Sequence, residues 1–201
     1  MDTLTPHSRD DFEILDEKTA YDGFFKVKHY SLRHKLFEGG WSQTFQREVF
    51  ERQPVAAVLP YDPVLDKVVL IEQFRVGPLH SPNPWLLELV AGISEEDEST
   101  EELVKREALE EAGIEILELI KAYDYWVSPG GSNEFLSLYC GKVDATYAGG
   151  HHGNLEEHED IKAHVLSSEK AFALLSQGEI KNAATIVSLQ WLQLNKDHIF
   201  T

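Results

Sequence analysis

The stretch GISEEDESTEELVKREALEEAGI, residues 92–114, decides how the rest of this sequence is interpreted. Its second half predicts a helix, because Ser99 is a natural N-cap and Glu102, three residues later, completes a capping box. Gly113 supplies the stop at the other end. The sequence therefore predicts one short helix with both ends defined by the chain itself.

Glu107 and Glu111 are four residues apart in this helix, so their carboxylates point from one face, and Glu110 lies beside them. Their Cβ atoms are expected roughly 5–6 Å apart, within reach of one hard cation or two neighbouring ones. Like charges at this spacing repel, so the cluster needs a compensating positive charge, and Mg²⁺ is the natural candidate. Arg106, four residues after Glu102, is expected to brace the cluster.

An acidic run such as residues 95–102 is by itself typical of a solvated helix face. The complete spacing is more specific, and its fixed positions are Gly92, Glu98, Arg106, Glu107, Ala108, Glu110, Glu111, Gly113 and Ile114. This pattern resembles the Nudix box of the Nudix hydrolase family at every defined position. The resemblance implies an α/β (α+β) fold, the Nudix α/β/α sandwich with a mixed central sheet, plus a small N-terminal antiparallel β domain. It also implies hydrolysis of a nucleoside diphosphate linked to another moiety.

Length and charge set the outer bounds of the interpretation. A chain of 201 residues suits one principal domain with an appendage, and we expect an N-terminal β segment over 1–52 and a Nudix domain over 53–201. The formal net charge of -17 argues against a general nucleic-acid binder, which needs a basic surface. The same charge would repel an anionic substrate unless cations and local Arg or Lys residues reverse the field at the site.

Cysteine usage and hydropathy predict a cytoplasmic protein without a membrane segment. Cys140 is the sole cysteine, which excludes an internal disulfide and fits a reducing compartment. The first twelve residues have neither an apolar nor a basic signal region, and no apolar run approaches membrane-spanning length.

Strand-like stretches flank the acidic helix. Between residues 21 and 50 the alternation is strand-like with a turn at Gly39-Gly40, but so few strands are marginal without a partner layer. Residues 56–77 predict two buried strands joined by a turn from Asp62 to Asp66. Further strands are expected in 85–92, 116–128, 135–143 and 161–165, and amphipathic helices in 167–178 and 182–196. Ser167 or Ser168 would cap the first of these helices and Asn182 the second.

The ADP-ribose pyrophosphatase subfamily of Nudix hydrolases is similar to this chain from about residue 21 to 194. In that subfamily the N-terminal β segment is exchanged across a homodimer and helps to build the substrate site. Pro129, about sixteen residues beyond the box, resembles the subfamily's characteristic proline. The positions that the resemblance implies for substrate binding are Phe24, Phe25, Arg47, Glu48, Arg52, Arg75, Ile93, Ser128, Pro129, Gly130 and Glu134. The alternatives are core aromatics for the phenylalanines, surface salt bridges for Arg47 and Arg52, and a snorkelling edge residue for Arg75.

The resemblance also assigns metal ligands and a general base. It implies two or three Mg²⁺ ions, with Mn²⁺ as the alternative, held by the Ala91 carbonyl, Glu107, Glu110, Glu111 and Glu159. Glu110 is either a ligand or a neighbour of the ligands. The glycine-rich loop after residue 148 would carry the general base, Glu157. Glu156 is the competing candidate for the base. The alternative for Glu157 and Glu159 is that each is a solvated loop carboxylate without a catalytic role. A zinc site built from His151, His152 and His158 is disfavoured, since no zinc-ligand spacing is present.

The implied reaction is hydrolysis of ADP-ribose to AMP and ribose 5-phosphate, with Glu157, Glu107 and Glu111 as catalytic residues. Two alternatives remain at this stage. The first is a broader pyrophosphatase acting on substrates such as GDP-mannose, NADH or a diadenosine polyphosphate. The second is a non-catalytic ADP-ribose-binding module, against which the intact acidic residues argue.

Overall fold

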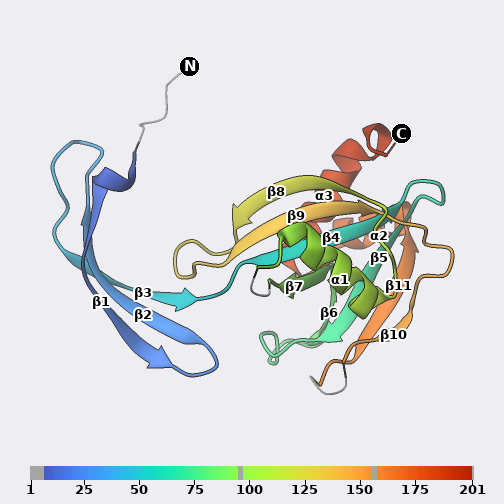
Figure 1. Ribbon diagram of the computed structural model, residues 1–201, viewed down its shortest axis with the longest axis horizontal. Helices are drawn as coiled ribbons and strands as arrows, with labels where there is room; N and C mark the ends of the chain where they lie inside the picture. The colour runs from blue at the N-terminus through green and yellow to red at the C-terminus, as the bar shows by residue number, and fades with distance from the viewer. Residues whose placement is uncertain (1–6, 95–96, 155–157, 201) are drawn as a thin grey trace. The chain divides into compact units, whose positions relative to one another are not determined.

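The structure, a computed structural model, describes residues 7–94, 97–154 and 158–200. Its contacts divide the chain into two compact units, each with its own β-sheet (Figure 1). The first unit ends at Gln53 and includes Trp126–Phe135. The second unit comprises Pro54–Tyr125 and the residues from Leu136 onward.

The first unit contains an antiparallel sheet with the strand order β1-β2-β3 in its described residues. The elements are a 3-10 turn η1 (Arg9–Asp11), β1 (Phe12–Asp22), β2 (Lys26–His34) and β3 (Phe45–Glu51). The expected turn is present, with φ of 92° at Gly39 and 79° at Gly40, values that glycine adopts without steric cost. No residue of these strands is buried, and β1 is exposed from Ile14 onward. The sheet therefore has no core of its own.

The second unit contains a mixed sheet that is eight-stranded in the described part of the chain. The strand order is β10-β11-β5-β4-β9-β8, with β6 paired to β5 and β7 to β4, and the β4–β9 pairing is parallel. The strands are β4 (Val55–Asp62), β5 (Lys67–Phe74), β6 (Trp85–Glu88), β7 (Val90–Ile93), β8 (Glu118–Trp126), β9 (Phe135–Lys142), β10 (Gly150–His152) and β11 (Ile161–Ser167). The mixed central sheet predicted from the sequence is confirmed.

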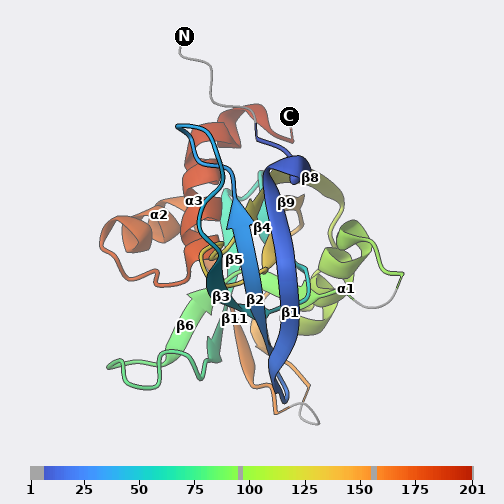
Figure 2. The same ribbon diagram turned by 90° about the vertical axis from the view of Figure 1, so that its left-hand side faces the viewer.

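Helices cover both faces of this sheet. Figure 2 shows α1 (Thr100–Ala112) on one side and α2 (Ser168–Ser176) and α3 (Ala183–Asn195) on the other. Along β5, Val69 and Ile71 belong to the core cluster with α1, whereas Val68 and Leu70 belong to the cluster with α2 and α3. A strand buried on both faces needs apolar residues at consecutive positions, which explains the apolar run in the sequence. None of the helices in the described residues is long and apolar enough to cross a membrane.

The turn between β4 and β5 is a fixed point of the second unit. Asp66, in a left-handed conformation with φ of 49°, accepts hydrogen bonds from Tyr61 Oη at 2.9 Å and Ser168 Oγ at 2.7 Å. Lys196 Nζ donates to the same carboxylate at 3.0 Å. Partial burial raises the pKa of Asp66, but these hydrogen bonds outweigh it and hold the pKa below its ordinary value of 3.8. One carboxylate thus ties the turn to the start of α2 and to the C-terminal 3-10 turn η3 (Lys196–His198).

Candidate active site

Helix α1 forms as the sequence predicts. The Ser99 hydroxyl accepts from the backbone N–H of Glu102, and the Glu102 carboxylate accepts from the backbone N–H of Ser99 at 3.0 Å, which completes the capping box. Gly113 ends the helix in the left-handed conformation with φ of 63°. Leu103 and Ala108 are fully buried against the sheet. This packing fixes the rotation of the helix and therefore the direction of its acids.

Glu111 is a carboxylate in a nearly dry environment. Glu111 is only 5% exposed, and its Oε2 accepts a hydrogen bond from the backbone N–H of Ala91 at 3.0 Å. Burial raises the pKa of Glu111 to about 8, and the nearby charges of Glu107 and Glu159 act in the same direction. The Ala91 N–H and the Arg75 guanidinium oppose the rise. Burial is therefore the main cause of the raised pKa of Glu111, and the two neighbouring acids add to it.

Gly92 makes room for the second acid of the helix. A Cβ atom at this position would overlap the carboxylate of Glu107, so no other residue leaves the acid in its place. Glu107 is itself partly buried, and burial raises its pKa, with Glu110 and Glu159 adding to the effect and Arg106 opposing it. The motif glycine thus has a steric role.

Arg106 braces the cluster, but not through the residue expected from the sequence. Glu102 is engaged in the capping box, and Arg106 instead forms a two-pronged pair with Glu98 at 2.9 and 3.2 Å. Its third nitrogen donates to Glu107 at 3.0 Å and to Glu110 at 2.9 Å. Because Glu110 is exposed and turned towards this arginine, its carboxylate lies beside the buried pair rather than within it.

Arg75 supplies positive charge close to the acids. Its guanidinium donates to Glu88 at 2.7 and 2.8 Å, and Glu88, 4% exposed, also accepts from the Asn182 side chain at 2.9 Å. Sequence reasoning missed Glu88 as the residue that holds Arg75. A signal was available, because Glu88 is a single acid inside the apolar stretch at residues 85–91.

The donor set suits a hard cation. Carboxylates and a backbone carbonyl are the oxygen ligands that Mg²⁺ takes in proteins, and Glu107, Glu111 and Glu159 are close enough for each charge to affect another's pKa. In the described residues, no three acidic, histidine or cysteine side chains already converge on one metal position. The grouping of these carboxylates fits a cation, and the individual ligand assignments stay predictions.

Comparison with known proteins identifies the family. Residues 51–195 match the family described as NUDIX domain. The chain belongs to the Nudix family. It is 48% identical over 188 residues to the "ADP-ribose pyrophosphatase" of Escherichia coli (strain K12), covering 93% of this chain and 90% of that one. It is 44% identical over 199 residues to the "ADP-ribose pyrophosphatase" of Haemophilus influenzae, covering 97% and 92%.

Similarity to a solved structure supports the fold alone. The structure titled "Crystal structure of ADP compounds hydrolase" superposes with a TM-score of 0.68, covering 94% of this chain and 97% of that one, at 20% sequence identity. Together with the mixed sheet between helices, this confirms the predicted Nudix fold.

The remaining predicted substrate residues of this Nudix protein lie mainly in the first unit. The Arg52 guanidinium lies 5.0 Å from the centre of the Phe25 ring and 3.5 Å from the Glu134 carboxylate. The backbone N–H of Arg52 also donates to Asn133 Oδ1 at 2.6 Å, and a backbone hydrogen bond joins Phe50 to Gly131. The loop with Ser128, Pro129 and Gly130 is thereby attached to the end of β3. The first unit thus gathers an aromatic ring, a guanidinium and a carboxylate.

Other predicted positions are exposed and make few contacts. Phe24 is 95% exposed and meets Phe25 edge to face, with ring centroids 4.8 Å apart. Arg47 lies over the Phe45 ring at 4.7 Å, and Glu48 is exposed on the same strand. In the second unit Ile93 is exposed directly after the motif glycine. The alternative of a core aromatic therefore does not apply to Phe24.

The loop that carries the predicted base is only partly described. Glu157 and its competitor Glu156 lie outside the described residues. Glu159 is half-buried. His151 and His152 are consecutive on β10, so their side chains point to opposite faces of the sheet, which does not suit a shared zinc ion.

Proposed function

We propose that this Nudix protein hydrolyses the pyrophosphate of ADP-ribose to AMP and ribose 5-phosphate in a divalent-metal-dependent reaction. The observation that carries the proposal is the pair of acids on α1, in which buried Glu111 accepts from the Ala91 backbone and Glu107 lies against Gly92, with Glu159 near both. The names of the relatives from E. coli and H. influenzae support the substrate. These relatives match the chain over nearly its full length, so the support extends to both units.

The residues divide the chemical work as follows. Glu107, Glu111, Glu159 and the Ala91 carbonyl would hold two or three Mg²⁺ ions, or Mn²⁺, with Glu110 beside them. When bound, such ions neutralise pyrophosphate charge and acidify water. In the reaction a water oxygen bonds to phosphorus as the bridging P–O bond breaks, and Glu157 would take the water proton. Arg75, held by Glu88, would bind a phosphate oxygen.

Substrate recognition would use both groups of predicted contacts. Phe24 and Phe25 offer aromatic faces for adenine, and Arg47 and Arg52 offer guanidinium groups for phosphate. The further contacts that we propose are Glu48, Ile93, Ser128, Pro129, Gly130 and Glu134. The Arg52 contacts with Phe25 and Glu134 support this assignment, because they already place three of the predicted residues together.

We also propose a homodimer in which residues 1–52 of one copy contribute to the substrate site of the other, with residues 53–201 as the catalytic domain. The support is the β1-β2-β3 sheet, which has no buried residue and exposes Ile14, Leu15 and Tyr21. Apolar side chains left exposed on a sheet are typical of an interaction surface. Sedimentation velocity measures the mass directly, and a monomer at micromolar concentration would contradict the dimer.

We propose a reducing, cytoplasmic setting for the protein, supported by the buried free thiol of Cys140.

The decisive experiment is a product assay on a small panel of nucleotides. Purified protein is incubated with Mg²⁺ and ADP-ribose, GDP-mannose, NADH or a diadenosine polyphosphate, and products are separated by chromatography. We expect AMP and ribose 5-phosphate from ADP-ribose at the highest kcat/KM, with no turnover in EDTA. Glu111→Gln should reduce kcat by orders of magnitude while the protein stays folded. ADP-ribose binding without turnover would favour the non-catalytic module, and wild-type activity of Glu111→Gln would refute the metal assignment.

A further inference from the structure

A row of polar side chains crosses the second unit on the face of the sheet opposite α1. His151 on β10 pairs with Lys162 on β11, and Lys162 pairs with Glu72 on β5. Directly opposed residues of neighbouring strands share a face, so the three side chains form one row. The neighbours Ile161 and Ala163 are buried in the core cluster with α1, which places Lys162 on the reverse face.

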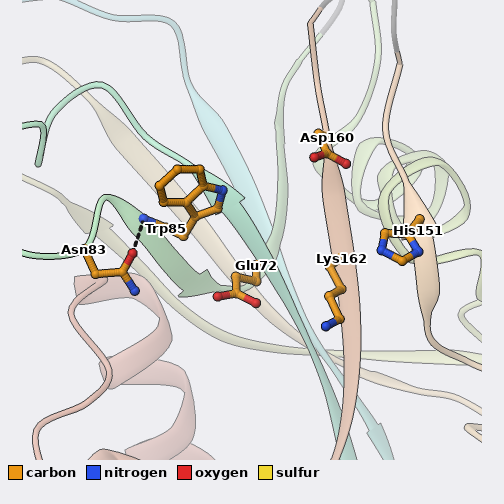
Figure 3. Close-up of a pocket in the computed structure, with 6 residues that line it drawn as sticks. All are labelled: Glu72, Asn83, Trp85, His151, Asp160 and Lys162. Carbon is orange, nitrogen blue, oxygen red and sulfur yellow. Dashed lines mark hydrogen bonds between the residues drawn. The ribbon is translucent and has the colours of Figure 1, made fainter.

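The row lines a cavity of about 370 Å³. Its lining residues are Glu72, Asn83, Trp85, His151, Asp160 and Lys162 (Figure 3). The volume is within the range of roughly 300–1,000 Å³ typical of small-molecule sites. Helices α2 and α3 pack on this face over Val68 and Leu70, the part of β5 that precedes Glu72. The cavity therefore lies on the reverse face of the sheet from the Glu107 and Glu111 carboxylates.

Trp85 provides the aromatic wall of the cavity. Trp85 is 50% exposed, and its ring contacts the Phe74 ring edge to face at a centroid distance of 5.2 Å. The backbone N–H of Trp85 donates to Asn83 Oδ1 at 3.1 Å, the dashed contact in Figure 3. This contact holds the Asn83 side chain at the backbone of Trp85. An exposed indole supported from one side is a stacking surface for a planar group.

The charges of the cavity favour a ligand with both an anionic group and hydroxyl groups. Glu72 Oε2 lies within hydrogen-bond distance of His164 Nε2, at 2.8 Å, so one oxygen of that acid is already engaged. Lys162, an exposed residue, makes no ion pair with another described residue, and its ammonium remains available to an anion. Asp160 and Glu72 retain carboxylate oxygens that accept hydrogen bonds from hydroxyl groups.

We propose that this cavity binds a nucleoside monophosphate. The base stacks on Trp85, the ribose hydroxyls donate to Glu72 and Asp160, and the phosphate binds Lys162 and His151. The indole, the acceptors and the ammonium provide one group for each part of such a ligand, whereas inorganic phosphate would use Lys162 and His151 alone. The site is separate from the proposed catalytic acids, because the residues of β11 alternate between the two faces of the sheet.

Occupancy of this cavity also affects the proposed reaction, and this part of the inference rests on the proposed function. Asp160 directly follows Glu159, the predicted metal ligand, and His151 and Lys162 lie on the two strands that flank the same loop. A ligand that contacts Asp160 therefore binds one residue away from Glu159. We expect AMP, a product of the proposed reaction, to change kcat by binding here.

Calorimetry on the full-length protein in EDTA tests the binding step, with AMP, adenosine and inorganic phosphate as separate probes. We expect AMP to bind more tightly than either fragment. Lys162→Ala should weaken AMP binding to this cavity, one class of sites in the titration, about 10- to 100-fold because a charged hydrogen bond is lost. Trp85→Leu should weaken the same class about 5- to 150-fold, from the loss of stacking. Lys170→Ala, at an exposed lysine on α2, is the matched control and should bind as the wild type does.

Wild-type AMP binding by both Lys162→Ala and Trp85→Leu would overturn the proposal. Phosphate binding as tight as AMP binding would overturn the nucleoside part and leave an anion site. If Trp85→Leu does not fold, as judged by circular dichroism, the exposed Lys162 decides alone. The effect on kcat is measured separately at saturating ADP-ribose, where competition by AMP at the catalytic site is overcome, and AMP must alter the kcat of the wild type but not that of Lys162→Ala. A protein that binds AMP here but hydrolyses no nucleotide would sink the proposed function and leave the site intact.

Discussion

Replacing Gly92 by alanine should inactivate this protein with little loss of stability. The new Cβ would occupy the space of the Glu107 carboxylate, and the overlapping atoms are the outer part of that side chain rather than backbone. The side chain can move aside, so we expect a stability cost at the lower end of the range for overpacking, about 1 kcal/mol. For a chain of this length that corresponds to a fall in Tm of roughly 2–4 °C.

The catalytic cost should be much larger. Glu107 is positioned by Arg106 on one side and Gly92 on the other, and a carboxylate displaced by an ångström no longer meets a cation with its partners. Misplacement of that size costs about 100-fold in rate, or about 2.7 kcal/mol of transition-state stabilisation. Steady-state kinetics with ADP-ribose over a range of Mg²⁺ concentrations measures it, and the Mg²⁺ requirement should rise.

Two controls separate this mechanism from general damage. Gly77→Ala adds the same methyl group where nothing lies within 4 Å, and it should behave as the wild type. If Gly92→Ala acts only through the Glu107 carboxylate, it should cost little further activity when added to Glu107→Gln. A Gly92→Ala protein with wild-type kcat/KM and Mg²⁺ dependence would refute the steric role of the glycine, and additive losses would show that the methyl group acts elsewhere.

Three further predictions follow from other parts of the second unit. Glu157→Gln should lower kcat by about 10²- to 10⁴-fold with little change in KM, and an unchanged kcat in steady-state assays would move the base to a neighbouring acid. Glu88→Gln should release Arg75 from its ion pair and lower kcat/KM about tenfold, or about 1.4 kcal/mol, in steady-state assays. Wild-type kinetics in this variant would show that Glu88 is not needed to hold Arg75. Because the pKa of Asp66 is lowered in the folded state, its contribution to stability is present above pH 3.8 and is lost as pH falls through the folded pKa. The difference in unfolding free energy between wild type and Asp66→Asn, from urea titrations, should therefore be constant near neutral pH and shrink in acid.

Local signals predicted the elements that local chemistry controls. Ser99 and Gly113 end α1 because a hydroxyl cap and a left-handed glycine act within one turn of the chain. The apolar run on β5 correctly predicted burial on both faces of the strand. That prediction is also local, because successive side chains of any strand point to opposite faces. The capping box also explains a failure, because Glu102 satisfies the helix end and is not available to Arg106.

Side-chain pairs that are distant in the sequence could not be predicted in this way. Glu88 lies 13 residues from Arg75 and 94 residues from Asn182, and only the folded sheet brings the three together. Periodicity identifies a face but does not choose among the several acids that could reach one arginine. The same limit applies to Arg52, whose contact with Glu134 spans 82 residues.

The position of Glu159 follows from apolar residues rather than from the acids themselves. Ile161 and Ala163 are buried in the core with α1, which pins the register of β11 against β5. A slip by one residue would bring Lys162 into that core and expose Ile161, so the hydrophobic effect opposes it strongly. With the register fixed, the segment that enters the strand brings the charge of Glu159 close enough to raise the pKa of Glu107 and Glu111. The alternation that fills the core therefore also places Glu159 near the two acids of α1.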